Sequence, residues 1–122
     1  MDMETALKEA MEIDGAIGVC VVDFDSGMSL GTLGGGKYLD LEVAAAGNTE
    51  VVRAKMRTMD ALGLNDAIDD ILITLGRQYH VIRIVNGRSG GSLFMYLALD
   101  RNKANLAMAR HRLKQIETTM SL

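Results

Sequence analysis

The spacing of apolar and polar residues divides the chain into eight regular segments. Near the N-terminus, apolar residues recur at three- and four-residue intervals, which predicts a short amphipathic helix that ends before Gly15. In three segments, nearly all odd and even positions alike are apolar, which is typical of strands buried on both faces. These segments are residues 16–24, 79–85 and 92–99. Residues 28–33 and 71–75 predict two weaker strands, and Asn86-Gly87 predicts a hairpin loop over residues 86–90.

Two further helices complete the pattern. Residues 39–62 read as one long helix despite Gly47 in its interior. Asp100 or Asn102 is a candidate N-cap for a final helix. That helix carries a single apolar stripe, made of Leu106, Ala109, Leu113, Ile116 and Met120.

The order of these elements is α-β-β-α-β-β-β-α, and it predicts an α/β (α+β) fold. Short connections between successive strands imply antiparallel pairing. An antiparallel sheet covered on one side only alternates apolar with polar residues, whereas three of these strands do not. We therefore expect helices on both faces, giving a three-layer sandwich around a five-stranded antiparallel sheet, within one domain spanning residues 1–122.

Composition narrows the class of protein. Of 122 residues, 48% are hydrophobic and 24% are charged, which is ordinary for a globular chain and not for a disordered one. A net charge of −3 gives no strong global field and so favours neither nucleic acid nor a membrane as partner. The charge is unevenly placed, because residues 1–40 hold eight acids and two lysines, whereas residues 101–122 hold five basic residues and one acid.

The location predicted for the protein is cytoplasmic. Cys20 is the only cysteine, so an internal disulfide is impossible. The acidic first helix is unlike a signal or transit peptide. The chain also lacks an apolar run of the roughly 20 residues that span a bilayer.

The long helix is the most informative segment, because it carries three stripes. A stripe of larger residues is expected to face the sheet: Leu41, Ala45, Asn48, Val52, Met56 and Met59. A second stripe consists almost entirely of small residues: Ala44, Gly47, Val51, Ala54, Thr58 and Ala61. The third stripe is charged: Glu50, Arg53, Arg57 and Asp60.

The small-residue stripe predicts a homodimer seam. A surface helix needs only one apolar stripe, and small side chains let a second helix approach closely. The same stripe in a second copy of the chain would meet it across a two-fold axis. Alanines are also good helix formers on a solvated face, which is the alternative, but Gly47 costs a helix up to about 1 kcal/mol and calls for a packing reason.

The third strand supports the same interpretation. If residues 71–75 form an edge strand, their unpaired backbone groups need protection. Pairing with a second copy through Ile71 and Ile73 would provide it and would join two sheets into one of ten strands.

Four segments give the chain a family resemblance. They are G-A-I-G-V-C-V-V-D-F-D-S-G-M at 15–28, L-E-V-A-A-A-G-N at 41–48, the L-G-R-Q-Y-H-V-I run at 75–82, and the strand-to-helix step over 97–109. Together these segments resemble the roadblock / dynein light-chain superfamily, over nearly the whole chain. The family pattern is mainly one of apolar positions.

The resemblance implies a profilin-like five-stranded sheet, a homodimer through the second helix and third strand, and no active site. Bacterial and archaeal members are regulators or scaffolds of Ras-like small GTPases, and one type stimulates GTP hydrolysis by remodelling the GTPase. Eukaryotic relatives serve dynein and membrane-signalling scaffolds. The expected function is therefore a non-catalytic GTPase regulator or scaffold that docks its partner through Glu50, Arg53, Arg57 and Asp60. A small-molecule-sensing or general protein-interaction module is the alternative.

Residues able to carry out chemistry do not form a recognisable site. Cys20 lies inside an apolar strand, and His80 and His111 lie on different elements without a second ligand at metal spacing. Asp23 and Asp25 flank a turn, where capping hydrogen bonds are the common role of aspartate. The sequence thus predicts no catalytic residue, no cofactor and no metal.

Two phosphate-binding readings are also weak. Gly34-Gly35-Gly36 precedes a helix but lacks the lysine and serine of a phosphate-binding loop. The basic last helix (Arg101, Lys103, Arg110, Arg112, Lys114) has no aromatic residues among its cations, so we expect a solvated face and no nucleic acid.

Overall fold

The computed structural model describes residues 1–85 and 91–121, and the predicted hairpin loop over residues 86–90 lies outside this range. Eight elements follow one another in the predicted order. They are α1 (Met3–Met11), β1 (Ala16–Asp23), β2 (Met28–Gly34), α2 (Leu41–Ala61), β3 (Asp70–Thr74), β4 (Gln78–Ile84), β5 (Leu93–Asp100) and α3 (Leu106–Thr119).

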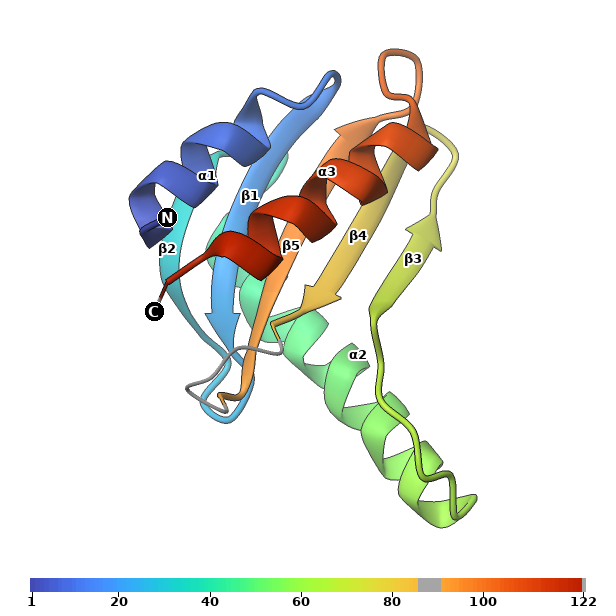
Figure 1. The fold of residues 1–122 in the computed structure, drawn as a ribbon. Helices are drawn as coiled ribbons and strands as arrows, with labels where there is room; N and C mark the ends of the chain where they lie inside the picture. The colour runs from blue at the N-terminus through green and yellow to red at the C-terminus, as the bar shows by residue number, and fades with distance from the viewer. Residues whose placement is uncertain (86–90, 122) are drawn as a thin grey trace.

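The five strands form one antiparallel sheet in the order β2-β1-β5-β4-β3. Helices α1 and α3 lie side by side on one face, and α2 crosses the opposite face (Figure 1). The predicted three-layer α/β sandwich is confirmed. β3 is an edge strand, as expected, and β2 forms the other edge.

Two apolar cores explain why the central strands lack alternation. In β5, Met95, Leu97 and Leu99 are buried against α1 and α3. The intervening Phe94 and Ala98 are buried on the α2 side. Both sets of side chains are almost fully removed from water, and each of residues 94–99 contributes to one core or the other.

The helix starts are set by N-cap side chains. Asp40 accepts hydrogen bonds from the amides of Glu42 (3.0 Å) and Val43 (3.2 Å), so α2 begins at Leu41 and not at Leu39. The cap of α3 is Asn105, whose side chain accepts from the amide of Met108 at 3.1 Å. The prediction of Asp100 or Asn102 was wrong.

Asp100 is unavailable as a cap because it belongs to the end of β5. Its amide donates to the carbonyl of Gly15 at 2.8 Å, and its carboxylate accepts from the amide of Asn102 at 2.9 Å. Gly15 has a φ of +86°, and a Cβ there would lie 2.9 Å from the backbone nitrogen of Ala104. This close approach brings the end of α1 next to the start of α3.

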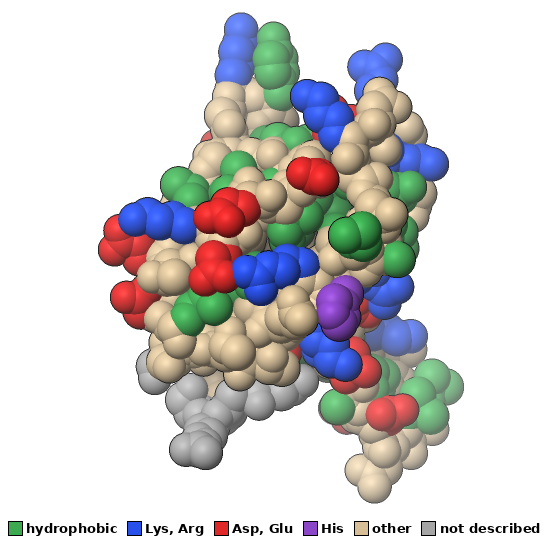
Figure 2. Space-filling model, turned by 45° about the horizontal axis from the view of Figure 1, so that its top comes forward, with side chains coloured by type: hydrophobic (Ala, Val, Ile, Leu, Met, Phe, Trp, Pro, Cys, Tyr) green, Lys and Arg blue, Asp and Glu red, His purple; other side chains and the backbone are tan. Residues whose placement is uncertain are grey.

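The uneven charge of the sequence is paired in part within the molecule. Arg112 of α3 forms an ion pair with Glu9 of α1. Arg110 binds both carboxylate oxygens of Asp70 at 2.8 Å, tying α3 to the edge strand β3. Figure 2 accordingly shows acidic and basic side chains next to one another on this face. Two cations of the predicted solvated face of α3 are thus engaged in ion pairs, although Arg110 stays exposed.

Candidate protein-interaction surface

Helix α2 buries one stripe against the sheet, with one change from prediction. Leu41, Ala45 and Val52 are buried as expected. Asn48 is only half buried, and Thr49 takes its place in the core with 3% exposure. The Thr49 hydroxyl donates to the carbonyl of Ala45 at 2.7 Å, so a polar side chain is buried there without needing a partner outside the helix.

The predicted small-residue stripe lies on the outer side of α2. At about 100° per residue, Ala54 is directly opposite the buried positions. Two members of the stripe, Ala44 and Val51, lie on the flank and are half buried against the core. The other four are exposed: Gly47, Ala54, Thr58 and Ala61. The small-residue stripe is therefore low in profile, with long side chains only beside it.

Gly47 has no packing reason inside one copy of the chain, and Thr58 has no unsatisfied polar group. A Cβ added at Gly47 would meet nothing within 4 Å, so the glycine is not required by packing in the protomer. The Thr58 hydroxyl donates to the carbonyl of Ala54 at 2.9 Å, so the helix itself satisfies its polar group. Both residues leave a flat surface suited to close helix contact.

Strand β3 presents the second part of the predicted seam. Ile71 and Ile73 both face the α2 side and are half buried there, since α2 packs mainly on β1 and β2. The outer backbone edge of β3 has no neighbouring strand within the described residues. Leu72 and Leu75 are 36% and 42% exposed beside this edge.

A groove that the sequence did not predict lies next to this edge. The C-terminal half of α2 extends past the sheet, alongside the segment that leads into β3 (Figure 1). Between them lies a groove of about 550 Å³, with Val51, Lys55 and Met59 on its helical wall and residues 64–71 opposite. Leu62 and Leu64, 65% and 51% exposed, follow the end of the helix. Two leucines in an otherwise polar loop were the available signal.

The charged stripe lies beside the small one on the outer surface of α2. Glu50, Arg53, Arg57 and Asp60 are all exposed. None of the four side chains forms an ion pair or hydrogen bond with the described residues. They are thus free to contact another molecule.

Residues considered for chemistry have structural roles. Cys20 is fully buried in β1, and burial raises the pKa of its thiol to about 12. His80 is half buried, with Nε2 2.7 Å from Oε1 of Gln78 and Nδ1 3.1 Å from the hydroxyl of Tyr96, and burial lowers its pKa. His111 is exposed on α3.

The two turn motifs also act locally. Asp23 accepts from the amide of Asp25 at 2.9 Å, and Asp25 accepts from the hydroxyl of Ser92 at 2.6 Å, which closes the β1–β2 turn onto the start of β5. Gly34, Gly35 and Gly36 all have positive φ and form the bend between β2 and α2. Across the described chain, no group of three His, Cys, Asp or Glu side chains is placed to hold a metal ion.

Comparison with solved structures places this fold. The Roadblock/LC7 domain from Streptomyces avermitilis superimposes with a TM-score of 0.79 at 10% identity, covering 98% of this chain and 94% of that one. Myxococcus xanthus MglB superimposes with a TM-score of 0.73 at 19% identity, covering 93% of this chain and 84% of that one. The gliding protein mglB from Thermus thermophilus superimposes with a TM-score of 0.70 at 17% identity, covering 94% of this chain and 87% of that one.

The chain therefore has the roadblock fold, and the resemblance inferred from its sequence is confirmed at the level of fold. No family model matches the sequence. No curated protein matches it either. Within the described residues, no helix is long and apolar enough to cross a membrane.

Proposed function

We propose that this protein is a homodimeric, non-catalytic regulator or scaffold that docks a Ras-like small GTPase. The observation that carries the proposal is the outer surface of α2, where a flat small-residue stripe runs beside unpaired charges and an open strand edge. The roadblock fold supports it, since the family resemblance implies such a role. No catalytic residue is assigned to this chain.

The dimer is proposed to form through α2 and β3. A two-fold axis would set Gly47 and Ala54 of one α2 against the same stripe of the other, at the short end of the usual helix separation of about 8–10 Å. Antiparallel pairing of β3 with its copy would satisfy both open edges. It would also carry the overhanging end of each α2, with Leu62, toward the half-covered β3 side of its neighbour.

The docking platform is proposed to be the paired helices. Because the charged stripe flanks the small stripe, a two-fold dimer places two copies of Glu50, Arg53, Arg57 and Asp60 around one axis. Exposed charges of both signs suit recognition of a polar protein surface. They set its orientation and association rate more than its affinity.

The test is titration with a Ras-like GTPase from the same source, following binding and GTP hydrolysis together. We expect the affinity for the GTPase to fall about tenfold or more in Arg53→Glu/Arg57→Glu. The new glutamates would repel the acidic groups of the partner that the two arginines contact in the proposed complex. The matched control is Arg77→Glu/Lys114→Glu, which makes the same charge change at exposed positions away from α2. Faster hydrolysis identifies a regulator, and binding alone identifies a scaffold.

The proposal is wrong if no such GTPase binds or changes its hydrolysis rate. It is also wrong in its choice of surface if the control variant weakens binding as much as the α2 variant does.

A further inference from the structure

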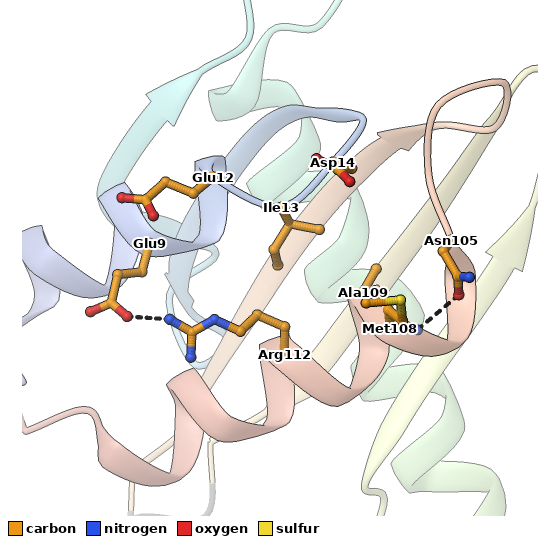
Figure 3. Close-up of a pocket in the computed structure, with 8 residues that line it drawn as sticks. All are labelled: Glu9, Glu12, Ile13, Asp14, Asn105, Met108, Ala109 and Arg112. Carbon is orange, nitrogen blue, oxygen red and sulfur yellow. Dashed lines mark hydrogen bonds and ion pairs between the residues drawn. The ribbon is translucent and has the colours of Figure 1, made fainter.

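A second groove lies on the opposite face of the sheet, between the end of α1 and the first half of α3 (Figure 3). Its volume is about 290 Å³. The residues that line it are Glu9, Glu12, Ile13, Asp14, Asn105, Met108, Ala109 and Arg112. None of them belongs to the α2 and β3 surface described above.

The rim of this groove is acidic. Glu9 is paired with Arg112, which closes one end of the groove. Glu12 and Asp14 are exposed, and neither carboxylate forms an ion pair or side-chain hydrogen bond with the described residues. The rim therefore carries more negative than positive charge.

The position of these acids is unfavourable for the isolated chain. Glu12 is the C-cap of α1, where the carbonyl ends of the helix are already partially negative. Cations are preferred at such a site, but the only basic residue in the last turn, Lys8, is paired with Glu4 at 3.2 Å. Glu12 and Asp14 also line a neighbouring hollow together with Asp100 and Lys103. Lys103 offsets the charge of one of these three acids, so acidic residues still outnumber basic ones around the turn. A cation supplied from outside would relieve this repulsion.

Apolar surface lies next to the acids. The side chain of Ile13 lies between the two helices, and Ala109 forms part of the opposite wall (Figure 3). Met108 is 70% exposed, although other large apolar residues of α3 are buried in the core. Methionine is flexible and polarizable, so it adapts to the shape of an apolar group placed on it.

We propose that this groove docks a segment of a partner protein in which a Lys or Arg lies close to one large apolar side chain. The cation is attracted by the acidic rim, where Glu12 and Asp14 lie on either side of Ile13, and the apolar group covers Met108 and Ile13 (Figure 3). The volume accommodates one or two side chains, so the segment is short and its affinity modest. Since the sheet separates this groove from α2, both surfaces can be occupied at once. The protein then acts as a two-sided adaptor.

The experiment uses the whole chain, labelled with ¹⁵N, and short synthetic peptides as probes. Each peptide contains one Arg and one Leu in a Gly/Ser background, with the spacing varied from adjacent residues to four apart. We expect at least one peptide to shift the amide signals of residues 9–14 and 105–112 and to leave those of α2 unchanged. A peptide with Glu in place of Arg, or Ser in place of Leu, should not do so.

Matched variants separate the proposed contacts from general charge. Glu12→Gln should weaken binding about threefold and Glu12→Gln/Asp14→Asn about tenfold, as expected for exposed charge contacts. Asp69→Asn removes one exposed charge far from the groove, in the segment before β3, and should leave binding within about twofold of the original protein. Met108→Gln should weaken binding, whereas Met28→Gln, at a residue 67% exposed on β2, should not.

The proposal is overturned if no Arg/Leu peptide shifts the groove signals, or if the shifts fall on α2. It is equally overturned if Asp69→Asn weakens binding as much as Glu12→Gln. Any of these results leaves the GTPase proposal standing, because that depends on the opposite face.

Discussion

The two faces of the sheet are covered in different ways. On one face, α1 and α3 cover the sheet except at the β3 edge, where Leu72 is 36% exposed, and Leu113 and Ile116 of α3 are fully buried. On the other, α2 packs on β1 and β2, extends past the edge, and leaves Ile71 and Ile73 half exposed. Leu62 at the end of α2 is 65% exposed. The chain thus completes one hydrophobic layer by itself and leaves the other unfinished.

This difference indicates where another molecule is needed. Buried apolar surface stabilises a fold by about 25 cal/mol per Å², and exposed apolar side chains beside an open edge gain that energy only on association. The α1/α3 face is stable without a partner and offers one small acidic groove. The α2 face is the one whose structure is expected to depend on protein concentration.

The largest effect is expected from Leu113→Ala, which tests the completed face. Truncating a fully buried leucine leaves a cavity and typically lowers the free energy of unfolding by about 2–5 kcal/mol. Urea denaturation at several protein concentrations measures it, and the loss should be of similar size at each. A loss below about 1 kcal/mol would show that α3 is not firmly packed.

The next effect is expected from Ala54→Glu, which tests the unfinished face. A charged side chain at the centre of the seam should weaken the dimer about a hundredfold, roughly 2.7 kcal/mol, and give a folded monomer. Light scattering after size exclusion measures the mass, and circular dichroism checks folding. Ala107→Glu is the control, at an exposed alanine of α3, and should remain dimeric. A folded, dimeric Ala54→Glu variant would place the seam elsewhere.

The smallest effect is a pH dependence at His80, which lies on the α2 side of β4. Burial lowers its pKa below the ordinary value of 6.5, so the unfolded chain takes up a proton more readily than the folded one. The neutral His80 ring costs the folded state nothing above pH 6.5. As the pH falls from 6.5 toward the lower pKa of His80 in the folded protein, the free energy of unfolding decreases.

Urea midpoints between pH 7.5 and 5.5 measure this loss. His80→Gln should flatten part of the decline, because the titrating ring is gone. His111→Gln, at an exposed position on α3, should follow the unmodified protein. Identical curves for all three proteins would mean that His80 is not protonated differently on folding.

Much of the fold could be predicted from residue patterns, because buried positions are apolar and the spacing of apolar residues therefore shows which faces of an element are buried. Strands β1, β4 and β5 are apolar at both parities since each has a core on both sides, and this alone indicated three layers. The failures were local. Asn105 and not Asp100 caps α3, because Asp100 is held in the sheet by Gly15.

The candidate surface was predicted in part, and its limits have a physical cause. Asn48 and Thr49 are both acceptable on a core-facing stripe, since steps of three and four residues return to nearly the same side of a helix. The crossing of α2 over β1 and β2 decides between them. The groove at Met59 and Leu64 was missed because it joins segments whose approach no periodicity encodes.

The sequence by itself determined the elements, their order, the two-sided sheet and the existence of a third, unburied stripe on the long helix. These follow from local period and composition, which act within a few residues of each position. Only the tertiary structure decided that the acidic first helix pairs with the basic last one, that α2 overhangs the edge, and that Glu12 and Asp14 are left unpaired. Those outcomes depend on contacts between residues far apart in the chain, where packing and charge act through space and leave no periodic pattern.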